Sequence, residues 1–105
     1  MKTCIADRKL LYSPHGGDER LNLVIRIGEP FLVEEGSVDF DAAEGVAGCR
    51  VEFEGPNIEL SHVVYGADRI QALQLASNIE PTLERLRSKY DFFFPSGEPY
   101  HNADD

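Results

Sequence analysis

The sequence predicts an α+β fold, with a four- to five-stranded, mainly antiparallel sheet and one long C-terminal helix packed on one of its faces. Apolar residues recur at helical spacing in the segment from Gly66 to Tyr90. Before this segment, residues 20–28, 46–54 and 58–65 alternate apolar and polar side chains, as strands with one buried face do. The 105 residues suffice for one core. We therefore expect a single domain over residues 1–96 and a mobile polar tail over residues 97–105.

The first strand is expected over residues 3–12. Its alternation of apolar and polar side chains slips between Lys9 and Leu11, which predicts a β-bulge there. Pro14, Gly16 and Gly17 then predict a hairpin loop, because these residues favour tight turns. The two glycines lack the spacing of a phosphate-binding loop, so we assign no such role to them.

Residues 20–28 form the clearest predicted strand. Arg26 and Asn22 occupy its polar side, and Gly28 and Pro30 end it before a brief restart over residues 31–33. The apolar side carries Leu21, Leu23, Ile25 and Ile27. One face of this strand is thus expected in the core and the other in solvent.

An acidic, glycine-containing stretch over residues 34–48 predicts a long loop. Five carboxylates suggest a calcium site, namely Glu34, Glu35, Asp39, Asp41 and Glu44. Their spacing does not fit an EF-hand, which needs oxygen ligands at alternate positions, a central glycine and a terminal glutamate. We therefore predict no metal site.

Residues 46–54 and 58–65 are expected to form a hairpin around the turn Gly55–Asn57. The expected inward side chains are Ala47, Cys49, Val51 and Phe53 on the first strand and Ile58, Leu60, His62 and Val64 on the second. The two cysteines, Cys4 and Cys49, are far apart and form no CxxC pair, so we interpret both as small buried hydrophobes.

The helix is expected to begin near Asp68, an N-cap residue with Gln71 three positions later. Its end is expected near Lys89 or Tyr90, because Arg85, Arg87 and Lys89 carry cations into the last turn. The predicted buried stripe comprises Ala72, Leu75, Ala76, Ile79, Leu83, Leu86 and Tyr90. Pro81 must bend or break this helix, and we favour one bent helix over two short ones.

Ile70 and Leu73 lie outside the predicted stripe and need a second partner surface. Either the preceding strand and the C-terminal segment cover them, or they form an interface with a second copy or another protein. Phe92 to Phe94 are expected to form a short final strand or an extended segment on the sheet, because three consecutive aromatic residues do not suit an exposed tail.

We assign no catalytic, cofactor-binding or metal-ligating residues. His62 and Tyr65 are the candidate lining of a pocket beside the helix N-terminus, where free backbone donors can hold an anion. No cysteine, serine or second histidine is placed to work with His62, which favours a structural role for it. Whether the protein is an enzyme is therefore open, with a noncatalytic protein favoured.

The net charge of −9 is concentrated in the middle of the chain, where residues 29–66 carry one arginine and nine acidic residues. Such a field repels phosphate backbones and anionic lipids, so we expect neither a nucleic-acid nor a membrane partner, whereas a basic protein would be attracted. The N-terminal residues lack the apolar core of a signal peptide, which predicts a cytoplasmic location.

The segment GADRIQALQLA resembles the motif G-x-D-x-x-Q-A-L-x-L-A of a family of short uncharacterised bacterial proteins, a domain of unknown function. The motif residues here are Gly66, Asp68, Gln71, Ala72, Leu73, Leu75 and Ala76. The segments 5–10 and 49–55 are similar to that family's first and third strands. The resemblance implies a strand running into a helix, and it implies no reaction, substrate or cofactor.

We therefore expect a noncatalytic protein-interaction module that acts as a homodimer or binds a basic partner protein. The acidic middle segment, the unplaced flank of Ile70 and Leu73, and the lack of a catalytic constellation favour this function. The alternative is a small-ligand-binding protein or enzyme with its site near the helix N-terminus.

Overall fold

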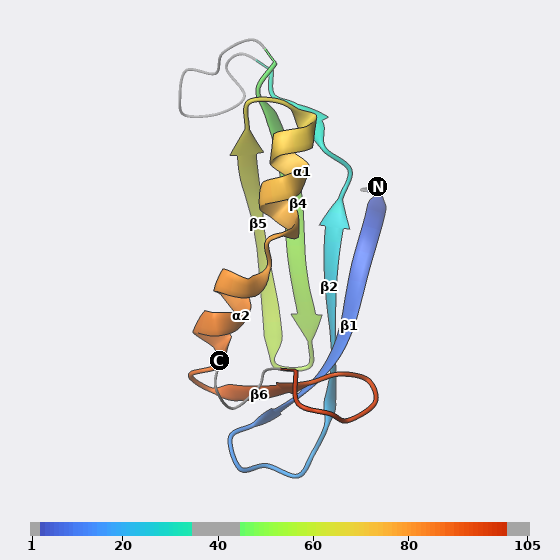
Figure 1. The fold of residues 1–105 in the computed structure, drawn as a ribbon, viewed down its shortest axis with the longest axis vertical. Coiled ribbons are helices and arrows are strands. Elements are labelled where there is room, and N and C mark those ends of the chain that lie inside the picture. Colours follow the sequence, from blue (N-terminus) through green and yellow to red (C-terminus); the bar gives the residue numbers. More distant parts are fainter. Residues whose placement is uncertain (1–2, 35–44, 101–105) are drawn as a thin grey trace.

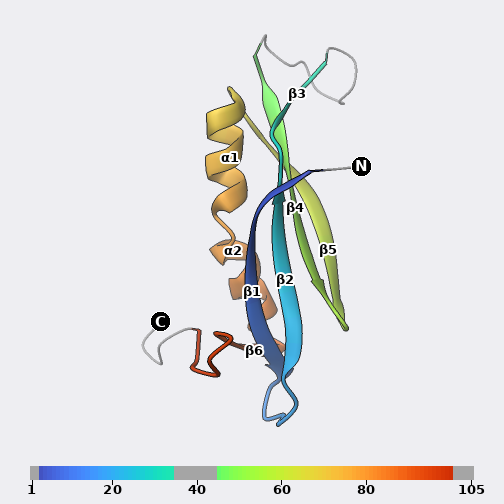
Figure 2. The same ribbon diagram turned by 90° about the vertical axis from the view of Figure 1, so that its right-hand side faces the viewer.

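A computed structural model describes residues 3–34 and 45–100, and it confirms the α+β fold. An antiparallel six-stranded sheet carries a helical segment, residues 69–86, on one face (Figures 1 and 2). The strand order is β3-β4-β2-β1-β6, and β5 pairs with β4 on its other side. The elements are β1 Cys4–Pro14, β2 Leu21–Gly28, β3 Phe31–Leu32, β4 Ala47–Gly55, β5 Ile58–Gly66, α1 Arg69–Ser77, α2 Glu80–Leu86 and β6 Tyr90–Phe93.

The core lies between the helices and one face of β1, β2 and β4. The inward residues predicted for β4 are all buried, and on β2 Leu23, Ile25 and Ile27 are buried as predicted. Tyr12 of β1 is fully buried, and its hydroxyl accepts a hydrogen bond from the Asn57 amide of the β4–β5 turn, with an N to O distance of 3.0 Å. The alternation of the two central strands thus suffices to define one side of the core.

The irregularity in β1 lies elsewhere than predicted. The pairing with β2 is regular from Ala6 to Tyr12, and the register shift falls between Cys4 and Ala6. Leu10 and Leu11 are both apolar because each face of β1 has a partner there: Leu10 is in the core, and Leu11 is opposite Phe93 of β6. The bulge predicted between Lys9 and Leu11 is therefore wrong.

The start of α1 is as predicted. The Asp68 carboxylate accepts a hydrogen bond from the Gln71 amide at 2.8 Å, and the Gln71 side chain accepts one from the Ala67 amide. Gly66 precedes this cap and is buried against the helix. A Cβ at Gly66 would lie 2.6 Å from the Ala72 nitrogen, so the strand and helix approach this closely only because the residue is glycine.

The helical segment is interrupted at Asn78 and Ile79, so it is not the single bent helix that we favoured. The Ile79 amide donates to the Ser77 carbonyl at 3.0 Å instead of continuing the α-helical pattern. Pro81 takes a position in the first turn of α2, where its missing N–H leaves no hydrogen bond unmade. Breaking the helix before Pro81 therefore removes the clash that a continuous helix would contain.

The second helix ends at Leu86, earlier than predicted, and Tyr90 begins β6 opposite Pro14. Phe92 is buried on this strand, which confirms that the aromatic run forms a final strand. Tyr100 then folds back, and its amide donates to the Phe92 carbonyl at 2.9 Å. Residues 97–100 of the expected mobile tail therefore pack beside β6.

The buried stripe is rotated relative to the prediction. Leu75 is 46% exposed, whereas Leu73 packs against the core. On an ideal helix these two side chains lie about 80° to either side of the line through Ala72 and Ala76, which are both buried. The position of α1 over β4 and β5 decides which of the two flanks is covered.

Of the inward residues predicted for β5, Ile58 is buried and Val64 packs against the core, but Leu60 and His62 are exposed. β5 is an edge strand, and α1 covers its upper part in Figure 1. Alternation therefore identifies the side of β5 that faces the helices but overestimates how much of that side is covered.

Candidate functional site

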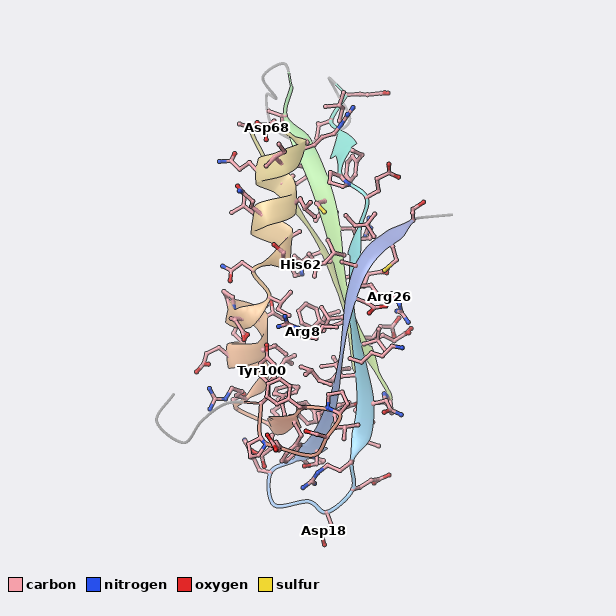
Figure 3. The ribbon with its side chains drawn as sticks, turned by 45° about the vertical axis from the view of Figure 1, so that its right-hand side comes forward. Arg8, Asp18, Arg26, His62, Asp68 and Tyr100 are labelled. Atoms are coloured by element: carbon pink, nitrogen blue, oxygen red, sulfur yellow. The ribbon has the colours of Figure 1, made fainter. Side chains whose placement is uncertain are left out.

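Within residues 3–34 and 45–100, no element packs on the face of the sheet opposite α1 and α2 (Figure 2). Because Ile25 and Ile27 of β2 and Cys49, Val51 and Phe53 of β4 point into the core, the residues that alternate with them point to this open face. Arg26, Arg50 and Glu52 are among these residues. Figure 3 shows Arg26 on this side, with Arg8 and Tyr100 on the side of the helices.

The open face carries a pocket of about 590 Å³ at one end. The start of β1, the end of β2 and the β2–β3 connection form its walls, and β4 forms its floor. The Glu29 amide donates to the Thr3 carbonyl at 2.9 Å and ties the connection to the first strand. The lining residues are Thr3, Cys4, Arg26, Gly28, Glu29, Pro30, Phe31, Arg50 and Glu52.

The charged groups of the pocket are not paired across the strands as their register would suggest. Arg26 is directly opposite Glu52, yet its guanidinium forms an ion pair with Glu54, with an N to O distance of 3.1 Å. Arg50 donates to the Ser61 hydroxyl at 2.8 Å. Among the described residues, Arg50 has no carboxylate and Glu52 no cation within ion-pair distance. Within the described chain, Arg50 is thus the lining arginine without a carboxylate partner, and the two lining glutamates, Glu29 and Glu52, have no cation partner.

Phe31 forms the apolar wall of the pocket and lies over Gly48 of the neighbouring strand. A Cβ at Gly48 would lie 2.6 Å from the Phe31 ring, so the glycine makes room for the ring. Phe31 is still 44% exposed. An aromatic surface thus stands beside the two guanidinium groups.

The two cysteines differ in their surroundings. Cys4 is exposed at the rim of the pocket, so the prediction that it is buried is wrong, because the edge position of this part of β1 leaves it uncovered. Cys49 is buried as predicted, and its thiol donates to the Gly28 carbonyl at 3.2 Å. Burial raises the pKa of the Cys49 thiol, which keeps it protonated and unreactive at neutral pH.

The pocket predicted beside the helix N-terminus is not assembled by its two candidate residues. His62 and Tyr65 are three positions apart on β5, so their side chains project from opposite faces of the strand. His62 stacks against Phe53, with ring centroids 6.4 Å apart, and both His62 and Tyr65 are exposed. The Asp68 and Gln71 side chains already engage amides at the start of the helix, as described above.

The two residues predicted as an interface, Ile70 and Leu73, differ in exposure. Ile70 is 70% exposed on α1, whereas Leu73 packs partly against the core. Leu73 thus packs within the fold, and of the two residues only Ile70 is exposed for contact with another protein.

A hydrogen-bonded group on the helix side joins the C-terminal segment to the body of the fold (Figure 3). Arg8 donates to the Tyr100 hydroxyl at 2.7 Å, and this hydroxyl donates to the Glu80 carboxylate at 3.2 Å. Burial and the neighbouring Glu80 raise the pKa of Tyr100. These contacts tie the C-terminal segment to β1 and α2.

The pocket residues Arg26, Arg50 and Phe31 are not predicted as a site from the sequence. The alternation of β2 and β4 places both arginines on the solvent side, but nothing in the sequence indicates that they approach each other. The five carboxylates of the calcium hypothesis lie outside the described residues except Glu34. Within the part of the chain that the structure describes, no three His, Cys, Asp or Glu residues are grouped to hold a metal ion.

Comparisons of the chain with family models, with curated proteins and with solved structures find no match. None of the helices in the described ranges is long and apolar enough to cross a membrane.

Proposed function

We propose that this protein is a noncatalytic protein-interaction module that forms a homodimer through its edge strand β5. The observation that carries the proposal is that β5, nine residues long, pairs with β4 alone in the described chain. Its free edge therefore offers backbone donors and acceptors to another strand.

The composition of β5 supports pairing rather than protection of this edge. Natural edge strands are usually blocked by lysine, proline or a bulge. β5 contains neither lysine nor proline, and its register with β4 is regular from Ile58 to Gly66. Leu60 and Tyr65 are 38% and 39% exposed on its two faces, so apolar surface accompanies the open backbone edge.

The single carboxylate of β5 favours an antiparallel arrangement of two copies. A two-fold axis at His62 would place Glu59 opposite Tyr65 of the second copy and about 20 Å along the strand from the other Glu59. A parallel arrangement would put the two Glu59 side chains together, which is unfavourable. An edge contact of nine residues is small, and we expect micromolar affinity.

Sedimentation velocity and light scattering over a concentration series up to about 1 mM test the homodimer. His62→Lys adds a like charge at the proposed two-fold axis and should weaken the dimer by about tenfold or more. Gln74→Lys, on the exposed surface of α1, adds the same charge away from β5 and should leave the dimer intact. A wild-type protein that stays monomeric, or a dimer that tolerates His62→Lys, would refute the proposed mode.

A basic partner protein is the second candidate, and the net charge of −9 favours it. Salt separates the two proposals. Added salt screens the repulsion between two acidic copies and should strengthen the homodimer, whereas it should weaken a complex with a basic protein. Dissociation constants measured at low and high ionic strength therefore distinguish self-association from binding of a basic partner.

A further inference from the structure

We propose that the pocket on the open face of the sheet binds a small organic molecule with a single carboxylate, with Arg50 as its anchor. The pocket is not part of the β5 edge, so this inference does not depend on the homodimer. A monomeric protein could bind such a ligand equally well.

Arg50 is suited to hold a carboxylate because its guanidinium is oriented and largely unused. It carries five N–H donors, and the single hydrogen bond from Arg50 to the Ser61 hydroxyl fixes the group above the sheet. No carboxylate of the described residues is within ion-pair distance of it. A carboxylate can therefore bind to the remaining donors in the bidentate geometry that arginine favours.

The charges around the pocket disfavour any ligand with more than one negative charge. The lining contains two arginines, Arg26 and Arg50, and two glutamates, Glu29 and Glu52, so their formal charges cancel. Arg26 is paired with Glu54, which is outside the lining, so with this pair the group carries one net negative charge and only Arg50 is left to attract an anion. A phosphate dianion would be repelled by the two glutamates, whereas one carboxylate at Arg50 adds only one negative charge.

The apolar part of the ligand has a place beside this anchor. Phe31 and Pro30 line the same pocket, and Phe31 is nearly half exposed. A planar ring next to the carboxylate could pack against Phe31 and remove this aromatic surface from water. The volume of about 590 Å³ is within the range of small-molecule pockets.

The test uses benzoate as the probe, titrated into the ¹⁵N-labelled full chain and followed by NMR. We expect saturable shifts of the amides of Gly28, Phe31 and Arg50, with a dissociation constant of about 1 mM. Benzamide, the neutral analogue, and inorganic phosphate should each bind about tenfold more weakly or not at all. Equal binding of benzamide, tighter binding of phosphate, or no saturable shift with benzoate would overturn the proposal.

Three variants locate the anchor. Arg50→Gln should weaken benzoate binding about tenfold or more, and Arg50→Lys should restore part of it, because lysine keeps the charge without the planar fork. Arg85→Gln, on the exposed surface of α2, removes the same charge elsewhere and should have no effect. If Arg85→Gln lowers affinity as much as Arg50→Gln, the effect is one of net charge and the proposed site is wrong.

Ser61→Ala gives a separate measurement in case Arg50→Gln perturbs the sheet. This change removes only the hydroxyl that positions Arg50, and it should weaken benzoate binding severalfold while the amide spectrum stays dispersed. Unchanged affinity in this variant would contradict the role of Ser61. Light scattering on the same samples reports the oligomeric state, so failure of the ligand site and failure of the homodimer can be told apart.

Discussion

Shortening Leu83 to alanine is expected to destabilise the protein far more than the same change at Leu75. Leu83 is fully buried, whereas Leu75 is 46% exposed. Both side chains belong to the stripe predicted from sequence, and both changes remove the same atoms. The comparison therefore measures how far the orientation of the helical segment, rather than its composition, determines the core.

The expected magnitudes follow from burial. Removing a buried leucine costs its transfer free energy and leaves a cavity, which together amount to about 3 to 5 kcal/mol. Leu75 loses only part of its transfer free energy and leaves no closed cavity, so we expect about 0.5 to 1 kcal/mol for Leu75→Ala. Alanine and leucine have similar helix propensities, so helix formation itself adds only a few tenths of a kcal/mol to either value, roughly.

Urea denaturation followed by far-UV circular dichroism gives the two free energies of unfolding. The slope of the free energy against urea should be the same in both variants, since neither changes the surface exposed on unfolding by much. Losses of equal size would refute the orientation of α1 described above. Equal losses are what the stripe predicted from sequence would give, because that stripe buries both leucines.

Three further predictions concern local features. Gly66→Ala should lower the free energy of unfolding in urea by about 2 to 3 kcal/mol, because the added Cβ would lie 2.6 Å from the Ala72 nitrogen. An unchanged free energy of unfolding would mean that β5 and α1 can move apart freely. Asp68→Ala removes the N-cap and should cost about 1 kcal/mol, which Asp68→Asn should largely restore. Burial raises the pKa of the Cys49 thiol, so Cys49 should react with iodoacetamide only at a pH above the ordinary thiol range or after unfolding, whereas exposed Cys4 should react readily. Peptide mass spectrometry measures the two rates separately. Equal rates would contradict the burial of Cys49. A group whose pKa is raised in the folded state favours that state below its unfolded pKa, so stability should fall as alkaline pH ionises the thiol of Cys49 in the unfolded chain.

Sequence alone accounts for the features that depend on neighbours along the chain. The alternation of Leu23, Ile25 and Ile27 defines the buried side of β2, because successive side chains of any strand point to opposite faces. The cap at Asp68 is likewise local, since its carboxylate reaches an amide only three residues away. Both could be predicted without knowing what packs against them.

Tertiary structure alone decides what depends on residues distant in the chain. Leu73 and Leu75 are symmetric about the buried line of α1, and only the placement of the helix over β4 and β5 buries one and exposes the other. Arg26 and Arg50 reach the same pocket only because β2 and β4 are adjacent, and their sequence positions carry no record of that pairing. Within the described residues, β5 pairs with β4 alone, and this too depends on which strands pair with which. Periodicity specifies which side of an element is apolar, whereas packing of the whole chain specifies how much of that side is covered and which polar groups meet on the other.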